Sequence, residues 1–159
     1  MNELSDTVES VLLDVNSLAI GLTDNHPAHE YIHPVLEDGV NGDIDLLIFS
    51  YLPLRAQYIM VSSFEVNRID ARNAVQSFLR SPVDIVSASK ETLLSSYEIS
   101  AEKNHDVYDC FFVALARQHR TEAILTTDTD FKKLCDDEEF LYVNPVPESV
   151  LEELGEVSG

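Results

Sequence analysis

Two predicted strands of this chain end in an aspartate, and a third aspartate lies near the start of a predicted helix. Asp14 follows the apolar segment 8–13, and Asp128 follows the apolar segment 123–127. Asp109 lies near the start of the helix predicted over residues 106–119, which leads into the second of these strands. In open parallel sheets, ligands bind outside the carboxyl ends of the strands. The spacing therefore allows the three carboxylates to meet at one edge of a sheet.

Three carboxylates that meet need a positive partner. Two unit charges about 4 Å apart repel each other by roughly 4 kcal/mol at an effective dielectric of 20. Protonation, basic side chains or a cation can offset this repulsion, and carboxylate oxygens with room for water suit Mg²⁺ or Mn²⁺. Such a metal can hold a phosphate and activate a water molecule. The alternative is that each aspartate only caps the helix that follows it, which is a frequent use of aspartate.

Strands and helices alternate along the chain. Apolar segments predict strands at residues 8–13, 45–49, 83–86, 123–127 and 140–143. Between and after them, helices are predicted from a cap at Asn16 or Ser17, from Pro27 as the first helical residue, from a cap at Ser50 through residue 59, and at 65–79, 90–103, 106–119 and 131–134. This alternation predicts a parallel sheet covered by helices on both faces, that is, a three-layer α/β/α fold with four to five parallel strands.

The length and composition favour one globular domain over residues 1–159, with a core at about 8–145 and a short acidic helix at 147–154. No apolar run approaches the roughly 18 residues that would cross a bilayer. The acidic start of the chain lacks a signal-peptide pattern, so we expect a cytoplasmic protein without a membrane partner. The absence of a glycine-rich phosphate loop argues against a nucleotide cofactor.

The charge of the chain is unusual. It has 29 acidic and 10 basic residues, for a formal net charge of −19. This charge repels nucleic acid at low salt, so either the partner is not a polyanion or the protein works in concentrated salt. The acidic residues are spread over the whole chain, which favours the surface of a halophilic protein.

Three segments surround the three aspartates, namely residues 13–18 (LDVNSL), 107–116 (VYDCFFVALA) and 124–131 (ILTTDTDF). In this order they resemble the opening motif, the third-acid helix and the last acidic motif of PIN domains. The toxin ribonucleases of VapC type are similar members of that family. The resemblance covers residues 8–145, with the motifs in the family's order and spacing.

The resemblance implies a PIN-like fold and the hydrolysis of RNA phosphodiester bonds with Mg²⁺ or Mn²⁺. Asp14, Asp109 and Asp128 would then be the catalytic metal ligands. It also implies an antitoxin protein that docks a helix over the acidic cleft, if the chain is a toxin, and a homodimer, for which the apolar helix around residues 51–60 is the expected interface.

Five further residues are expected around the metal site. By the resemblance, Asp130 would be an auxiliary acid, and Asn16 and Thr126 would hold the metal ligands by hydrogen bonds. Asp106 lies one helical turn before Asp109, where it either faces the cleft or caps the helix. Arg55 falls where PIN domains usually place a glutamate.

The side chain of Arg55 has three alternative interpretations. It neutralises the carboxylates in place of a metal, it holds a substrate phosphate beside the metal, or it turns outward and pairs with surface acid. The first reading leads to an alternative function, a catalytically weakened PIN-fold module that binds RNA or a protein partner.

Overall fold

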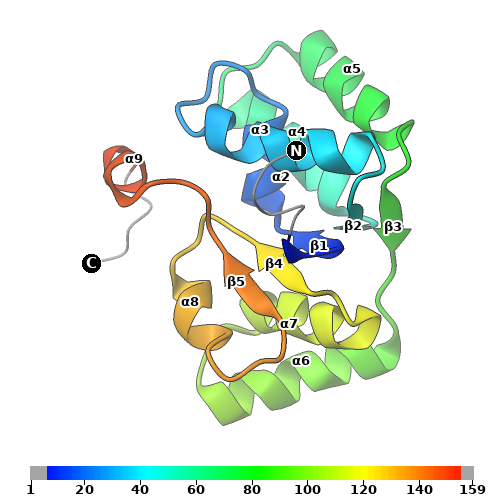
Figure 1. Ribbon diagram of the computed structural model, residues 1–159, viewed down its shortest axis with the longest axis vertical. Coiled ribbons are helices and arrows are strands. Elements are labelled where there is room, and N and C mark those ends of the chain that lie inside the picture. The colour runs from blue at the N-terminus through cyan, green and yellow to red at the C-terminus, as the bar shows by residue number, and fades with distance from the viewer. Residues whose placement is uncertain (1–6, 155–159) are drawn as a thin grey trace.

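A computed structural model of the chain describes residues 7–154, which form one five-stranded sheet with helices on both of its faces (Figure 1). The strands are β1 (Ser10–Leu13), β2 (Asp45–Phe49), β3 (Asp84–Val86), β4 (Ala123–Leu125) and β5 (Leu141–Val143). The helices are α2 (Val15–Gly21), α3 (His29–Val40), α4 (Leu52–Ser62), α5 (Arg68–Leu79), α6 (Lys90–Lys103), α7 (Val107–His119), α8 (Asp130–Leu134) and α9 (Glu148–Glu153).

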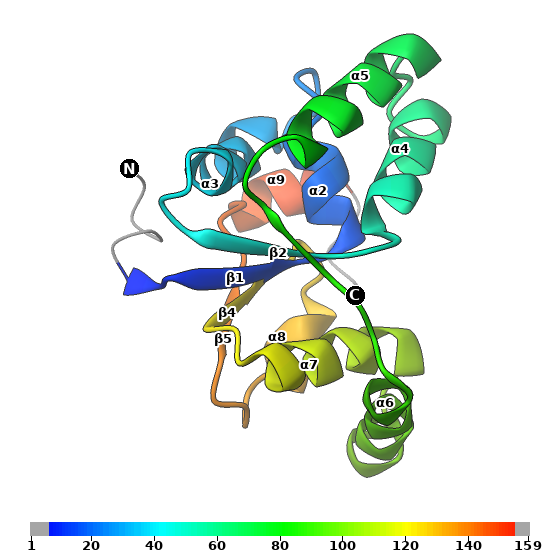
Figure 2. The same cartoon turned by 90° about the vertical axis from the view of Figure 1, so that its right-hand side faces the viewer.

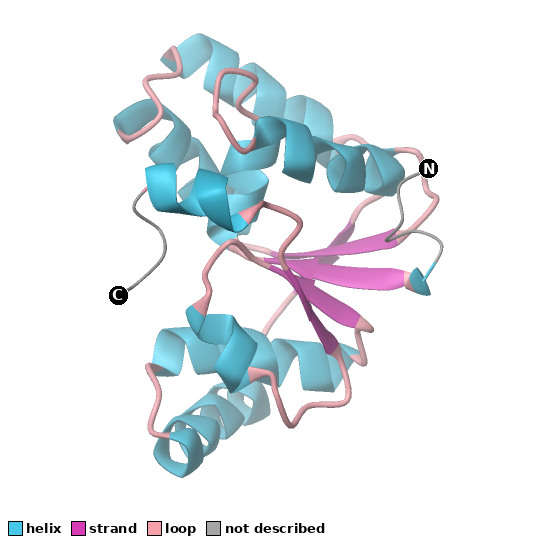
Figure 3. Ribbon diagram, turned by 60° about the vertical axis from the view of Figure 1, so that its left-hand side comes forward, coloured by secondary structure: helices cyan, strands magenta, loops and turns pink. Residues whose placement is uncertain are grey.

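The sheet is parallel throughout, in the order β3-β2-β1-β4-β5. One face is covered by α2, α3 and α4, with α5 beyond them, and the other face by α6, α7 and α8 (Figures 2 and 3). A parallel sheet covered on both sides needs apolar residues on both faces of each central strand. Accordingly, Leu12, Leu13 and Ile124 are fully buried. The predicted three-layer fold with a parallel sheet is confirmed.

Several helices begin at a different residue from the one predicted. Asp14 caps α2 through its side chain, in place of Asn16 or Ser17. The residue before α4 is Tyr51, in place of Ser50, and the residue before α3 is Ala28, so that Pro27 lies outside the helix. In each case the pattern located the helix correctly, but the capping residue depends on backbone angles that periodicity does not report.

The α5 helix begins later than predicted because the backbone turns at Glu65. This residue adopts a left-handed conformation with φ of 57°, which a helix cannot include. Asn67 then caps α5 by accepting a hydrogen bond from the amide of Ile69, at 2.8 Å. None of the helices between residues 7 and 154 has the length and apolar composition that crossing a bilayer requires.

A buried carboxylate, Glu138, ties α6 and α7 to the loop before β5. Its side chain is 5% exposed and accepts two hydrogen bonds from Arg117, both at 2.6 Å, and one from Lys103 at 2.9 Å. The two basic groups lower the pKa of Glu138 from its usual value of 4.5, with the hydrogen bonds from Arg117 as the main cause. The helices of this face are therefore held to the sheet by paired charges as well as by apolar packing.

We predict that Glu138→Gln lowers the free energy of unfolding by about 2 kcal/mol at neutral pH, because two charged donors lose their ionic acceptor. A lowered pKa in the folded state stabilises the protein above the unfolded pKa of about 4.5, and this contribution disappears as the pH falls. The difference between wild type and variant should therefore shrink in acid. Urea unfolding of both proteins measures it, with the exposed neighbour Glu139→Gln as the matched control; an equal loss in the control would contradict the prediction.

Candidate active site

The pairing of β1 with β4 positions Asp14 beside Thr126. Leu13 and Leu125 are partners in the register of the two strands, so the next residue of each strand lies at the same edge of the sheet. The amide of Asp14 donates to the carbonyl of Leu125 at 3.3 Å, and the hydroxyl of Ser17 donates to the same carbonyl at 3.2 Å. The start of α2 is thus fixed to the end of β4.

Both carboxylate oxygens of Asp14 accept a hydrogen bond. The amide of Ser17 donates to Oδ1 at 2.9 Å, and the hydroxyl of Thr126 donates to Oδ2. The same Thr126 hydroxyl oxygen accepts a hydrogen bond from the amide of Asp128 at 3.0 Å. Thr126 therefore connects the two strand-end aspartates by hydrogen bonds.

Burial raises the pKa of Asp14 to about 6, from its usual value of 3.8. The residue is only 6% exposed, so its charged form is poorly solvated. The hydrogen bonds from Thr126 and Ser17 lower the pKa, whereas the negative charge of Asp128 raises it further. Burial therefore disfavours the charged form of Asp14, and the hydrogen bonds offset only part of this effect.

Asp109 lies in the first turn of α7, which begins at the edge of the sheet where β1 and β2 end (Figure 2). Its Oδ2 atom is 3.0 Å from Nε2 of His105. Burial is the main cause of a raised pKa for Asp109, and the charge of Asp128 raises it as well, whereas His105 lowers it. The charge of Asp128 thus acts on both Asp14 and Asp109, although the three side chains are not grouped closely enough to hold a metal ion as they stand.

Three of the other predicted residues lie two or three positions along the chain from one of these aspartates. Asp106 is the exposed N-cap of α7 and accepts a hydrogen bond from the amide of Tyr108 at 2.8 Å, so it caps the helix. Asp130 is exposed, and its amide donates to Oδ1 of Asp128 at 2.9 Å. Asn16 is half-buried in the first turn of α2, where no hydrogen bond joins its side chain to the three aspartates.

Arg55 does not neutralise the acidic side chains. It is exposed on α4, its guanidinium lies 5.4 Å from the centre of the Tyr58 ring, and none of the ion pairs among residues 7–154 includes it. The readings in which Arg55 replaces the metal or pairs with surface acid are therefore not found in this arrangement. Its positive charge still reaches Tyr108, whose pKa it lowers against the larger effect of burial. Contact with a substrate phosphate remains a prediction.

Two kinds of observation bear on a metal ion. Among residues 7–154, no three histidine, cysteine or acidic side chains are grouped closely enough to hold one as they stand. However, Asp14 and Asp128 form no ion pair in this part of the chain, and their mutual repulsion is left without a cation. An oxygen donor set of this kind fits Mg²⁺ or Mn²⁺ by its chemistry.

The sequence reasoning missed His105, Tyr142 and Asn144. His105 lies four residues before Asp109, just before α7 begins, and a histidine this near to a predicted catalytic acid is a signal that could have found it. Tyr142 lies in β5, close enough to Asp128 and Asp14 for their charges to raise the pKa of its hydroxyl, although burial is the main cause. The side-chain amide of Asn144 donates to this hydroxyl at 3.1 Å. Both residues reach the site because β5 pairs with β4, which periodicity alone cannot show.

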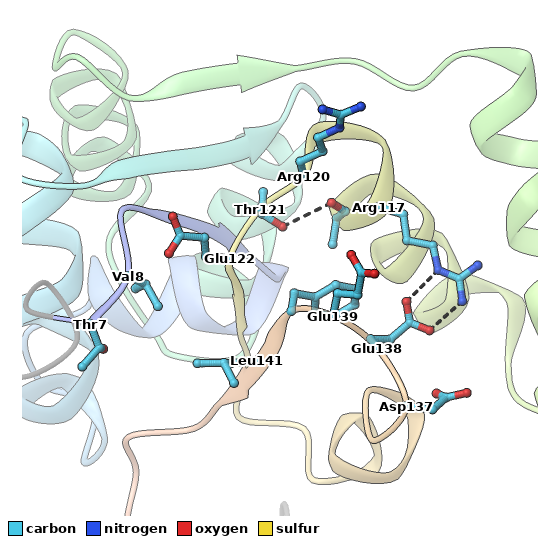
Figure 4. Close-up of a pocket in the computed structure, with 12 residues that line it drawn as sticks. Thr7, Val8, Arg117, Arg120, Thr121, Glu122, Asp137, Glu138, Glu139 and Leu141 are labelled. Carbon is cyan, nitrogen blue, oxygen red and sulfur yellow. Dashed lines mark hydrogen bonds and ion pairs between the residues drawn. The ribbon is translucent and has the colours of Figure 1, made fainter.

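A cavity of about 770 Å³ lies away from these aspartates (Figure 4). Its walls include Val8, Glu122 and Leu141, which precede or begin β1, β4 and β5. It therefore opens at the amino ends of the strands, whereas the aspartates follow the carboxyl ends. We assign no chemistry to this cavity.

Comparison with protein families matches residues 11–137 to the PIN domain, and the chain therefore belongs to the PIN domain family. This confirms the resemblance described above. Comparison with curated proteins gives no match.

Three solved structures share the fold. The VapBC2 structure from Rickettsia felis, bound to a DNA fragment from its promoter, is 16% identical, with a TM-score of 0.63 over 85% of this chain and 98% of that chain. The Mycobacterium tuberculosis toxin VapC20, which cleaves the sarcin-ricin loop, is 12% identical, with a TM-score of 0.61 over 77% and 93%. A toxin–antitoxin complex from Klebsiella pneumoniae is 19% identical, with a TM-score of 0.59 over 85% and 97%.

The raised pKa of Asp14 predicts that the metal-free protein loses stability as the pH rises. Between the unfolded pKa of 3.8 and the folded pKa of about 6, the folded state binds more protons than the unfolded state. Its stability therefore falls through this range, by about 3 kcal/mol for Asp14 alone. Asp14→Asn removes this dependence, so the stability of wild type relative to the variant should fall by about 3 kcal/mol between about pH 3.5 and about pH 7.

Urea unfolding in the presence of a chelator measures this difference. The exposed Asp43→Asn is the control, and it should change the stability by less than about 0.5 kcal/mol at each pH. A constant difference between wild type and Asp14→Asn over the whole range would show that Asp14 titrates normally.

Proposed function

We propose that this PIN domain is a metal-dependent endoribonuclease, with Asp14, Asp109 and Asp128 as ligands of Mg²⁺ or Mn²⁺. One observation carries the proposal. Asp14 is a buried carboxylate, beside the charge of Asp128 and without a cationic partner in the described part of the chain. A group held in this way opposes folding, and a bound cation would relieve the repulsion.

The residues around the aspartates would hold them in a fixed geometry. Ser17 and Thr126 each bind one oxygen of Asp14, so the carboxylate cannot rotate freely. His105 binds Oδ2 of Asp109, and Oδ1 accepts no hydrogen bond from the residues that the structure describes. The loss of such a supporting contact typically lowers metal affinity or activity by 10- to 100-fold. A bound metal ion would lower the pKa of a water molecule and stabilise negative charge on a scissile phosphate.

The other predicted residues have smaller parts in this proposal. Asp130 adds negative charge beside Asp128, to which its amide donates. Asn16 lies two residues after Asp14 at the same end of α2, and it would hold the metal ligands by hydrogen bonds once a metal is bound. Asp106 caps α7 and so fixes the turn that carries Asp109. Arg55 would contact a phosphate of the RNA.

We infer further that the chain is the toxin of a toxin–antitoxin pair, with a protein partner over the acidic edge of the sheet. The support is the fold, which it shares with structures of VapC toxins and of toxin–antitoxin complexes. A homodimer through α4 belongs to the same proposal, because Leu54 and Tyr58 of that helix are 67% and 62% exposed.

The alternative is a PIN-fold module with weakened activity, which binds RNA or protein without cutting. Arg55 in place of the expected acid favours it, and so does the absence of a preformed three-ligand group among residues 7–154.

Cleavage of single-stranded RNA separates the two functions. In about 1 M KCl, where charge repulsion is screened, wild type should cut RNA with Mn²⁺ or Mg²⁺. Asp14→Asn and Asp109→Asn should lower the rate by about 100-fold or more, because each removes a metal ligand. The exposed Asp43→Asn should retain the wild-type rate. Metal should raise the Tm of wild type more than that of Asp14→Asn.

A wild type that neither cuts RNA nor gains thermal stability with metal would favour the weakened module. Arg55→Glu then restores the expected acid, and activity in that variant would assign the defect to Arg55.

A further inference from the structure

A second cavity, of about 520 Å³, lies between the end of β2 and the helices α6 and α7. Its walls are mainly aromatic and apolar, with Phe49, Tyr51, Leu93, Tyr97, Tyr108 and Phe111 as the large side chains. The rings of Phe49 and Phe111 pack edge to face at 4.8 Å. The three tyrosines are 66%, 65% and 53% exposed, in chain order, which is unusual for large side chains around an apolar cavity. The cavity therefore offers open aromatic faces to a ligand.

This aromatic pocket adjoins the acidic site. Tyr108 lines the pocket and directly precedes Asp109 on α7. It is close enough to Asp14, Asp109 and Arg55 for all three charges to act on its hydroxyl. A ligand that reaches the aspartates from this side would pass over Tyr108.

The aromatic pocket is also free of acid. None of its eleven lining residues belongs to the 29 acidic residues of the chain. Arg55 lies one turn after Tyr51 on α4, and its charge reaches the pocket at Tyr108. In a chain with a net charge of −19, the walls of this pocket carry no negative charge of their own and one cation lies near them, while Asp14 and Asp109 act on the border of the pocket at Tyr108.

We propose that the aromatic pocket takes an unpaired base of single-stranded RNA, and that Arg55 contacts the phosphate beside that base. The proposal rests on the ribonuclease function proposed above, and it assigns that site a subsite for the substrate. Bases stack on aromatic side chains in a largely sequence-independent way, and a basic group beside the stack holds the backbone. Ser50 and Ser87 also line the pocket, and a serine hydroxyl can donate to or accept from the edge of a base.

The test measures RNA affinity separately from cleavage. Binding of a labelled single-stranded RNA of about ten nucleotides is followed by fluorescence anisotropy, in an Asp14→Asn background that does not consume the RNA. Tyr97→Ala and Leu93→Ala should each weaken binding by about tenfold, because the first removes a ring on which the base stacks and the second removes apolar surface against which the base packs. Tyr97→Phe keeps the ring and should bind within about twofold of the parent.

Two further variants sharpen the test. Leu94 neighbours Leu93 on α6 and is 57% exposed but does not line the pocket, so Leu94→Ala is the matched control and should leave the affinity unchanged. Arg55→Gln should reduce the slope of log affinity against log salt by about 0.7, the value for one phosphate contact on a single strand. Circular dichroism and the Tm verify that each variant is folded.

The results separate this proposal from the ribonuclease function. Equal RNA affinity in Tyr97→Ala, Leu93→Ala and Leu94→Ala would overturn the proposal even if wild type cuts RNA. If these variants kept RNA affinity but lost self-association in sedimentation, the pocket would belong to a second copy, which also overturns it. A tenfold loss confined to the pocket variants would support the base subsite even if wild type cuts no RNA.

Discussion

The parallel pairing of β1 with β4 is the constraint on which the candidate site depends. Because Leu13 and Leu125 are partners, the residues that follow them must leave the sheet side by side. The Thr126 hydroxyl then donates to Asp14 and accepts from the amide of Asp128. A shift of this register by one residue would exchange the faces of β4 and separate the two aspartates. The apolar residues that fix the register therefore also determine which polar side chains meet at this edge of the sheet.

Much of the fold was predictable because its signals are local. The α6 helix has the predicted bounds, since Ser89 and Thr92 form a reciprocal capping box and Asn104 ends the helix in a left-handed conformation. The late start of α5 was not predictable, because the left-handed turn at Glu65 leaves no mark in hydrophobic periodicity.

The residues of the candidate site were likewise predictable where their signals are local. Asp14, Asp109 and Asp128 were predicted from strand ends and family motifs. In the structure, the charge of Asp128 acts on both Asp14 and Asp109, and their role as metal ligands stays a prediction. Tyr142 lies near Asp14 and Asp128 because β5 pairs with β4, and the local sequence does not show this tertiary contact. For Arg55, the sequence gives the position on α4 but not the direction of a long, exposed side chain, which lies over Tyr58.

Asp14 serves two purposes at once, as the cap of α2 and as the buried acid of the site. A neutral residue such as asparagine or serine caps a helix about as well as aspartate does. At this position the negative charge also interacts favourably with the start of the helix, but burial costs more folding free energy than this gains, because the pKa of Asp14 is raised and not lowered. The chain thus gives up stability at neutral pH for a charge that the folded protein alone does not need. A lineage freed from the need for that charge would be expected to replace it by a neutral cap and become more stable.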